Sequence, residues 1–265
     1  MKAQSSLIKK IIAILVLAAT QTVCADLSTG LVAHYPFSGN ANDASGNGHH
    51  GTAYGATITV DRFGNPNSAF TFDGIDDSVL VPDHPQLDGM NALTLSLWVR
   101  TDRVDHMTEV LNKWVAGDSP LVGVYNMGID TGGQTAFQYC TDDAYVIKIS
   151  EVTLGTDSWH HIAGVYTGAE GSIYIDGSLA ALSRDDPDAL GPLHSIADDL
   201  LIGAGNLRGD LIHFFNGSID DVRIYDRALS SAEIGDLRFV PIPGGMLLGV
   251  LGLGCAGLRL RRGLH

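Results

Sequence analysis

Two adjacent carboxylates, Asp220 and Asp221, lie inside a stretch, Ile219 to Tyr225, that otherwise has the pattern of a β-strand. Neighbouring residues of a strand point to opposite faces, so the two carboxylates are not expected to share one role. A carboxylate that points toward a buried face costs free energy unless a positive group meets it. Arg223 or a metal ion is the expected partner, and the rest of the chain is expected to build the sheet that this strand completes.

A second group of oxygen-bearing residues lies in the polar loop that follows the first predicted strand. Asn42, Asp43, Ser45 and Asn47 stand close together there, among several glycines. Carboxylate, amide and backbone carbonyl oxygens are the ligands that calcium prefers, so the loop is a candidate calcium site, although its spacing is not that of an EF-hand. An ordinary glycine-rich turn is the alternative.

The acidic residues are unevenly distributed. Only four of the 30 acidic residues are glutamates, and Asp favours turns and calcium loops whereas Glu favours helices. Six of the 16 basic residues lie in the two terminal segments, while all 30 acidic residues lie between them. So negative a body repels nucleic acid, and we expect no nucleic-acid partner. The charge suits an exported domain that holds divalent cations, although solubility alone accounts for most of these acids.

No arrangement of residues predicts an enzyme. Glycoside hydrolysis needs two carboxyls about 5–10 Å apart, and no two glutamates fall within one predicted strand. His160 and His161 are strand neighbours that face opposite ways, so they cannot form a dyad. The sequence has neither a nucleophile elbow nor a phosphate-binding loop. Cys140 is the only cysteine outside the terminal segments, which excludes a disulfide within the body.

Residues 1–25 are predicted to be a secretory signal peptide. Three lysines precede the apolar core Ile11–Ala19, and a small-residue cleavage site ends at Ala25. A lipid anchor on Cys24 is the alternative, but the residues before it fit a lipobox badly. The mature domain is therefore predicted to span residues 26–238, outside the cell.

Residues 239–265 are predicted to be a membrane-directed tail. Val240–Pro243 breaks any preceding structure, Gly244–Leu258 is an uncharged apolar run, and a cluster of three arginines follows at once. The run is slightly shorter than the ~17–25 residues of a spanning helix. The arginines are expected to stay cytoplasmic, which leaves the domain outside.

This tail resembles the PEP-CTERM sorting signal of bacterial envelopes, which has a Pro-containing tetrapeptide, a short apolar helix and an Arg cluster in the same order. Ile242 stands where glutamate is commonest in that class. The resemblance implies an envelope sorting protease that cuts near Pro243, with transient membrane insertion before processing. A plain C-terminal membrane anchor is the alternative.

The body has the pattern of many short strands. In Leu93–Arg100 the apolar side chains alternate, so Leu93, Leu95, Leu97 and Val99 are expected to face a core and the residues between them a wet surface. In Ile219–Tyr225, Ile219 and Tyr225 are expected on one face, and Val222 and Ile224 on the other. Ser230 with Glu233 forms a capping box that predicts one short helix through Leu237.

Three aromatic residues lie among polar loops in the middle of the chain. Trp114, Tyr139 and Tyr145 are of the type that stacks on sugar rings in carbohydrate-binding proteins. Half-buried packing is the commoner role of such residues and is the favoured alternative. The three remain the ligand-contacting residues that the sequence suggests.

Taken together, these stretches resemble the laminin-G-like branch of the concanavalin A-like lectin/glucanase superfamily. The resemblance covers nearly all of residues 27–237. The stretches that carry it are LVAHYPFSGNANDASGNGHHG (Leu31–Gly51), FTFDGIDDSVLVP (Phe70–Pro82), LTLSLWVR (Leu93–Arg100), WHHIAGVY (Trp159–Tyr166), IYIDGSLA (Ile173–Ala180) and FNGSIDDVRIYDRALSSAEI (Phe215–Ile234).

The resemblance implies an all-β fold, a jelly-roll sandwich of two antiparallel sheets, to which the signal helix and the C-terminal membrane helix are added. Many members hold a structural calcium where the first loop meets the last strand. Carried onto this chain, Asp43 and Asp220 are the implied side-chain ligands, and Gly48 or a neighbour supplies a carbonyl. The alternative is that Asp220 pairs with an arginine or caps backbone amides.

These features predict a non-catalytic extracellular or cell-surface module that recognises polysaccharide or a surface glycoconjugate and carries a structural calcium. A structural or adhesive matrix protein that contacts other proteins is the alternative. A glycoside hydrolase is less favoured, although the superfamily contains glucanases. A row of exposed aromatics on one sheet face would favour sugar binding.

Overall fold

The computed structural model describes residues 26–116, 123–142, 144–181 and 190–239. The predicted signal peptide and all but Phe239 of the predicted tail lie outside the described residues. Among the described residues, no helix combines the length and the apolar character that crossing a membrane requires. The domain boundaries expected from the sequence stay predictions.

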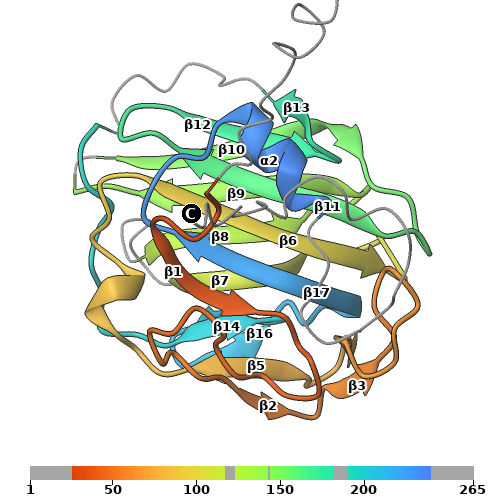
Figure 1. Ribbon diagram of the computed structural model, residues 1–265. Helices are drawn as coiled ribbons and strands as arrows, with labels where there is room; N and C mark the ends of the chain where they lie inside the picture. The colour runs from red at the N-terminus through yellow and green to blue at the C-terminus, as the bar shows by residue number, and fades with distance from the viewer. Residues whose placement is uncertain (1–25, 117–122, 143, 182–189, 240–265) are drawn as a thin grey trace, which may run out of the picture. The chain divides into compact units, whose positions relative to one another are not determined.

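The described body is built from two β-sheets, and the first, sheet A, contains the strand with the paired carboxylates (Figure 1). The path of sheet A runs β13-β12-β11-β6-β17-β4-β3, and β1 pairs with β17 beside β4. Its strands are β13 (Ser178–Ala181), β12 (Gly171–Ile175), β11 (His160–Tyr166), β6 (Leu93–Thr101), β17 (Asn216–Tyr225), β4 (Ala69–Asp73), β3 (Thr57–Thr59) and β1 (Leu31–Tyr35).

The second sheet, sheet B, runs β10-β9-β8-β7-β14-β5-β2, with β15 and β16 beside β7. All its pairings are antiparallel except a short parallel contact between β15 and β7. Its strands are β10 (Tyr145–Thr153), β9 (Gln134–Cys140), β8 (Gly123–Ile129), β7 (Thr108–Ala116), β14 (Leu200–Ile202), β5 (Ser78–Val81), β2 (Thr52–Tyr54), β15 (Gly205–Leu207) and β16 (Asp210–Ile212). A jelly-roll sandwich is therefore the fold, as the sequence predicts.

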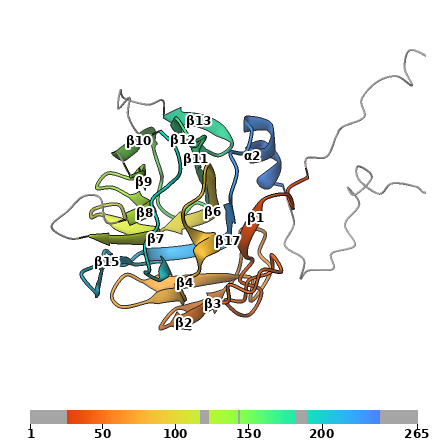
Figure 2. The ribbon, with the colours of Figure 1, turned by 90° about the vertical axis from the view of Figure 1, so that its left-hand side faces the viewer.

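The hydrophobic core lies between the two sheets, which form separate layers in Figure 2. The alternating residues of β6, Leu93, Leu95, Leu97 and Val99, are all fully buried there, which confirms the predicted inward face. The layers approach most closely where a glycine leaves room. A Cβ placed on Gly164 of β11 would lie 2.7 Å from the ring of Phe137 in β9. Small and large side chains thus interlock across the sandwich.

The outer face of sheet A is covered in part by one helix, α2 (Ser231–Leu237), which lies on the side away from sheet B (Figure 2). Ser230 accepts from the Glu233 amide, and the Glu233 carboxylate accepts from the Ser230 amide, so the predicted capping box is present. Ile234 and Leu237 pack against Ala163, Val165 and Tyr225 of the sheet. The expected wet face is therefore wrong here, because Thr94 and Ser96 are buried.

Strand β17 is not a regular strand, because it carries a β-bulge at the paired carboxylates. The register against β6 shifts between Asp220 and Arg223, and Asp221 adopts a left-handed backbone with φ of 52°. The extra residue resets the alternation, so Ile219 joins Val222 and Ile224 in the core. The expectation that Ile219 faces away from Val222 is therefore wrong. Tyr225 alone of the four faces the helix side.

Four strands of three residues escaped prediction from the sequence, namely β2, β3, β15 and β16. Each is too short to show a period-two pattern, and each forms because a neighbouring strand supplies its hydrogen bonds. A single 3₁₀ turn, η1 (Pro85–Leu87), follows β5 and inserts the buried Leu87 into the core.

Candidate functional site

The carboxylate of Asp43 is the centre of the polar loop after β1. One oxygen, Oδ1, accepts from the backbone amides of His34 (2.9 Å) and Ser45 (2.8 Å). The other, Oδ2, accepts from the amides of Gly48 (3.1 Å) and His49 (3.0 Å) and from the Ser45 hydroxyl (2.8 Å). Although burial opposes the change, these donors lower the pKa of Asp43. Asp43 therefore fastens the loop to β1 through protein donors.

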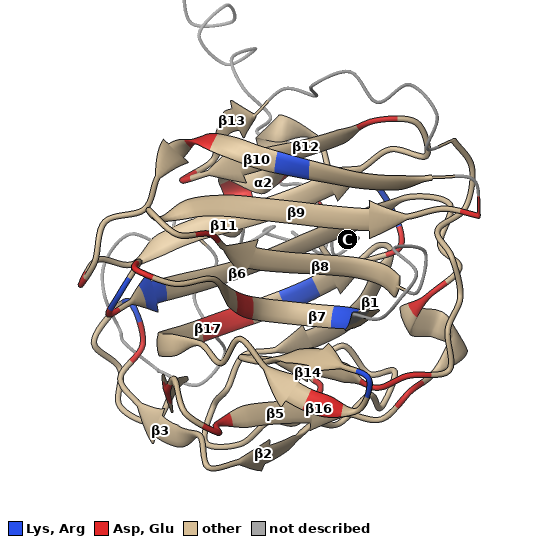
Figure 3. Cartoon of the chain, turned by 180° about the vertical axis from the view of Figure 1, so that it is seen from behind, with Lys and Arg blue, Asp and Glu red and all other residues tan. Residues whose placement is uncertain are grey.

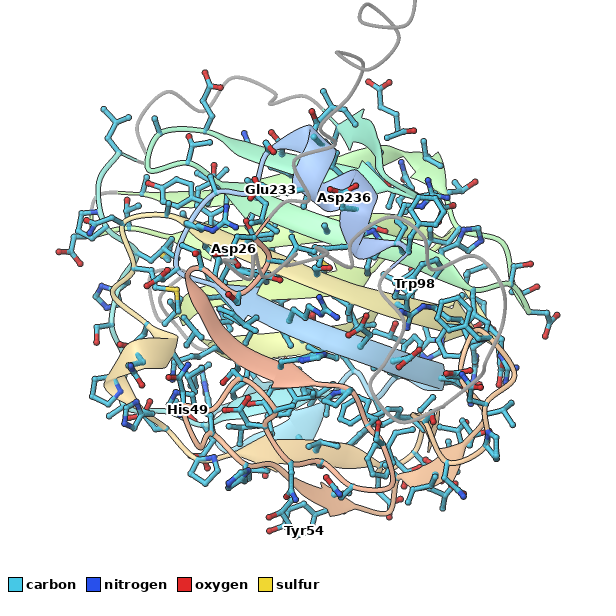
Figure 4. The ribbon with its side chains drawn as sticks, in the orientation of Figure 1. Asp26, His49, Tyr54, Trp98, Glu233 and Asp236 are labelled. Atoms are coloured by element: carbon cyan, nitrogen blue, oxygen red, sulfur yellow. The ribbon has the colours of Figure 1, made fainter. Side chains whose placement is uncertain are left out.

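The carboxylate of Asp220 is fully buried on the outer side of β17 and meets a guanidinium that the sequence did not suggest. Arg62 Nη1 lies 2.5 Å from Asp220 Oδ2, and Arg62 Nη2 lies 3.0 Å from Asp221 Oδ2. The guanidinium also lies against the rings of Phe63 (4.5 Å) and Trp98 (4.9 Å). Figure 4 labels Trp98 on this side of sheet A. The bulge thus turns both neighbouring carboxylates toward one arginine.

The second carboxylate, Asp221, belongs to a denser set of charges. Its Oδ1 contacts His34 Nε2 at 2.8 Å and Arg223 Nε at 2.9 Å. Burial alone would raise the pKa of Asp221, but His34, Arg223 and Arg62 together hold it well below its usual value. Burial raises the pKa of Asp220 to about 8, against the influence of Arg62. The prediction of Arg223 as a partner is confirmed for Asp221, whereas Asp220 is paired with Arg62.

The residues expected to hold calcium do not fit that ion as the structure arranges them. Asp43 directs both oxygens at backbone and hydroxyl donors, Gly48 supplies an amide to that carboxylate, and Asp220 points at a guanidinium. A cation placed among these groups would have to displace five hydrogen bonds or stand beside a positive charge. The alternative of an arginine partner and capped amides describes the contacts that these residues make, and calcium binding stays a prediction.

A second acidic cluster lies at the turn between β4 and β5. Oxygens of Asp73, Asp76 and Asp77 all lie within 4.8 Å of one another. Asp73 and Asp76 are exposed, and Asp77 accepts from the Asp73 amide at 2.8 Å. Exposed turn acids of this kind are common without an ion, and we assign the cluster no role.

The aromatic residues suggested by the sequence separate into two environments. Trp114 and Tyr145 lie together on the outer face of sheet B, with ring centroids 5.2 Å apart; Trp114 is only 8% exposed, whereas Tyr145 is half-buried. Tyr139 lies on the opposite side of β9, is only 2% exposed and packs on Tyr166 at 4.6 Å within the core. Tyr139 therefore cannot contact a ligand, and that part of the prediction is wrong.

The Trp114–Tyr145 pair lines a hollow of about 210 Å³ on the outer face of sheet B. A row of amide side chains crosses it, because Asn112 pairs with Asn126 and Asn126 pairs with Gln138 in the strand register. Tyr145 donates its hydroxyl to Gln138 Oε1 at 3.1 Å, and Asn126 Oδ1 is buried without a hydrogen-bond partner. We call this feature the amide groove. Figure 3 looks onto this face, where β8 and β9 carry no charged residue.

Glu109 forms the acidic side of the amide groove. Its side chain packs against Gly128 and Gly205, where a Cβ would meet it at 2.8 and 2.9 Å. Oε2 is buried without a hydrogen-bond partner, and Oε1 lies 3.7 Å from His213 Nδ1. The contact with Glu109 raises the pKa of His213 above its ordinary value. This pair was not among the residues that the sequence suggested.

A smaller apolar hollow of about 110 Å³ adjoins the amide groove and shares Met107, Glu109 and Gln138 with it. Its remaining lining includes Ile129, Ala136, Ile147 and Ile149, together with Gly128 and Asp130. Ile147 and Ile149 are 44% and 47% exposed, so two large apolar side chains lie next to each other on the outer face of β10. No Lys or Arg is among the described residues that line either hollow. The outer face of sheet B therefore offers stacking rings, amides, one buried carboxylate and an apolar step.

Comparison with known proteins identifies the fold family. Residues 73–235 match a laminin G-type family model described as the concanavalin A-like lectin/glucanases superfamily. That match covers most of the sandwich. The chain belongs to this superfamily. A search of curated protein sequences gave no match.

Several solved structures share the concanavalin A-like sandwich at low sequence identity. Domain 4 of AbnA, an extracellular GH43 arabinanase from Geobacillus stearothermophilus solved with arabinotriose, is 23% identical with a TM-score of 0.58; the match covers 78% of this chain and 97% of that domain. The binding domain of Paraclostridial mosquitocidal protein 1 is 16% identical with a TM-score of 0.62, over 79% of this chain and 52% of that one.

A third structure, from work on the cell entry of botulinum neurotoxin type C through two ganglioside molecules, is 14% identical with a TM-score of 0.56. The match covers 80% of this chain and 52% of that one. The chain thus spans a whole arabinanase domain but only about half of each toxin binding domain. At these identities the likeness shows the concanavalin A-like fold alone.

Proposed function

We propose that this concanavalin A-like domain is a non-catalytic module that binds polysaccharide or a glycoconjugate through the amide groove. The observation that carries the proposal is the Trp114–Tyr145 pair beside a row of amides on a face of sheet B where β8 and β9 carry no charged residue. Aromatic faces stack on the apolar faces of sugar rings, and amides can both donate to and accept from hydroxyls. A groove built this way recognises a neutral chain of hydroxylated rings.

The neighbouring structures support a binding role. The arabinanase domain was solved with an arabinose oligomer, and the type C neurotoxin depends on gangliosides. Both are glycans held by proteins that share this sandwich. The two proteins differ in ligand, so they support the class of ligand rather than one sugar.

We propose that the groove binds polysaccharide without hydrolysing it. Hydrolysis requires one carboxyl on each side of the scissile bond. Glu109 and Asp130 are the two carboxylates among the described residues that line the hollows, and Asp130 lies beyond the end of β8. We therefore assign the groove to binding and expect no release of reducing ends from polysaccharides that the domain binds.

The proposed setting is outside the cell. Export rests on the predicted signal peptide of residues 1–25, and retention rests on the predicted tail of residues 239–265, either as an anchor or as the substrate of a sorting protease. Fractionation of cells that carry a tag after residue 26 tests this setting. Recovery of the tagged domain only in the cytoplasm would contradict it.

Titration of the full chain with soluble oligosaccharides tests the proposed function. Trp114→Ala is expected to weaken binding about tenfold or more, because it removes the largely buried ring against which Tyr145 packs in the wall of the groove. Tyr54→Ala is the matched control, since Tyr54 is an exposed aromatic on the distant strand β2 (Figure 4). Equal losses in both variants would contradict the groove. Binding to proteins but to no glycan would favour the adhesive alternative.

A further inference from the structure

We propose that the ligand of the amide groove carries an N-acylated amino sugar, whose ring lies on Tyr145, the more exposed member of the Trp114–Tyr145 pair, and whose acyl group enters the adjoining apolar hollow. The amide N–H of that substituent donates to Glu109, at the border between the two hollows. This inference rests on the proposed function and names the sugar class that the same site selects.

The first argument is the state of Glu109. Glu109 is only 6% exposed, its Oε2 is buried without a hydrogen-bond partner, and its Oε1 lies 3.7 Å from His213 Nδ1. A buried carboxylate without donors is costly. A structural residue would have acquired donors, as Asp43 has acquired five. A ligand N–H donor supplies what the fold leaves out.

The second argument is the position of the apolar hollow. It borders the amide groove at Glu109, Met107 and Gln138, so a substituent that leaves the sugar ring beside Glu109 continues directly into it. Ala136, Ile147 and Ile149 line it with methyl and methylene groups. In an acylamino group the N–H and the methyl lie close together. The N–H can therefore meet the carboxylate of Glu109 while the methyl enters the apolar hollow. A bare hydroxyl would leave this hollow filled with water.

The third argument is charge. No Lys or Arg is found among the described lining residues, so a uronic or sialic acid would bring a second carboxylate beside Glu109 with only His213, which already contacts Glu109, to offset it. A free ammonium would pair with Glu109 but would place its hydration shell against Ile147 and Ile149. An acylated amine donates its N–H to Glu109 and places its methyl group against Ile147 and Ile149, without a second negative charge and without a hydrated ammonium group. The half-buried amide of Gln138 can meet the acyl carbonyl or a ring hydroxyl, whereas Asn126 is only 3% exposed.

Isothermal titration with four oligosaccharide series of matched length tests the inference. The series are N-acetylated glucosamine and galactosamine oligomers, their de-N-acetylated forms, neutral glucose oligomers and glucuronate oligomers. We expect one N-acetylated series to bind at least tenfold more tightly than the glucose oligomers and the ammonium forms. We expect the glucuronate oligomers to bind weakest.

Two variants locate the acyl group. Ala136→Leu fills the apolar hollow and is expected to abolish the preference for the N-acetylated series while leaving binding of glucose oligomers within a factor of two. Ala53→Leu, the same change on exposed strand β2, is the control. Glu109→Gln keeps an acceptor and is expected to weaken N-acetylated ligands by a few fold only. A larger loss for ammonium ligands in that variant is expected, because their ion pair disappears.

The outcomes separate the inference from the function. Equal affinity for glucose and N-acetylated oligomers, still sensitive to Trp114→Ala, overturns the inference and keeps the groove. Tightest binding of glucuronate or of the ammonium form overturns it as well. Binding of no oligosaccharide overturns both. Thermal melts of each variant show whether it is folded, and an unchanged preference in a folded Ala136→Leu protein also contradicts the assignment.

Discussion

Most of the buried carboxylates described above accept hydrogen bonds or ion pairs from protein donors, and each carboxylate has its own set of partners. Asp43 is surrounded by amides, Asp220 by Arg62, and Asp221 by His34 and Arg223. Each donor offsets the cost of removing a charge from water. Glu109 on the outer face of sheet B differs, because its Oε2 is buried without a hydrogen-bond partner and only its Oε1 faces a basic group, His213. This difference is why we propose Glu109 as a ligand contact.

Replacement of Asp43 by alanine is expected to destabilise the domain by about 3 kcal/mol, because several amides lose their buried acceptor together. The loss should be the same in calcium and in chelator, since protein donors occupy both oxygens. Calorimetric melting measures it, with Asp76→Ala, an exposed acid, as the control. A melting temperature that rises with calcium in the wild type and not in Asp43→Ala would reinstate the metal.

Replacement of Arg62 by methionine is expected to cost about 3–5 kcal/mol, because it leaves two buried carboxylates without their guanidinium. Arg103→Met provides the matched control, since Arg103 pairs with Asp105 at an exposed site, where water and salt screen the ion pair and little stability is lost. Urea unfolding measures both values. Similar losses in the two variants would show that Arg62 does not stabilise the bulge.

At the scale of elements, strand β17 and the two sheets determine where those side chains point. The bulge at Asp221 turns neighbouring carboxylates to one partner and keeps Ile219 and Val222 in the same core. In strand β11, Gly164 has no side chain and so leaves space for Phe137 of the opposite sheet. A sandwich packed at this density tolerates no added methyl at such a point.

Substitution of Gly164 by alanine is therefore expected to destabilise the fold by about 1–3 kcal/mol through overpacking. The added Cβ would meet both Phe137 and Met127 closer than van der Waals contact. Chemical denaturation measures the loss of stability. The control is Gly235→Ala, because an added Cβ there would have no atom within 4 Å. Gly89→Ala is not a suitable control, because the φ angle of Gly89 is positive. A neutral Gly164→Ala variant would mean that the two sheets can separate locally.

At the scale of the whole molecule, the two outer faces of the sandwich differ in how far they are covered. Sheet A is covered by α2 and by buried ion pairs, whereas sheet B presents the amide groove. Burial on sheet A also keeps His161 neutral, and it lowers the pKa of that residue to about 4. Its Nε2 lies 2.8 Å from the Ser96 hydroxyl, and its ring lies beside Trp98. Stability therefore depends on pH through this covered face.

Acidification is expected to weaken the fold through His161. The unfolded chain takes up a proton below its pKa of about 6.5, whereas the native His161 takes it up only near pH 4. The stability contributed by the neutral side chain is thus lost as the pH falls from about 6.5 to about 4, by roughly 3 kcal/mol.

Comparison of wild type with His161→Gln isolates this contribution from the carboxylates, several of which titrate in the same range. We expect the difference in unfolding free energy between the two proteins to fall as the pH is lowered from 7 to 4. A difference that stays constant over this range would mean that His161 is accessible to protons in the folded domain.

The sequence by itself determined the features that depend on near neighbours. The alternation in Leu93–Val99 specified an inner face because side chains of a strand point alternately. The Ser230–Glu233 capping box specified α2 because both partners lie within one turn. The order of the motifs also indicated the fold family, which the match over residues 73–235 confirms.

Tertiary structure alone decided the site. Arg62 meets Asp220 across 158 residues of chain, and no local pattern encodes that contact. The amide groove joins side chains from β7, β8, β9 and β10 whose adjacency follows from strand register, which is set by long-range pairing. The same register placed Tyr139 in the core and Tyr145 on the surface. A bulge of one residue reversed the faces of β17, because the period of a strand is only two residues.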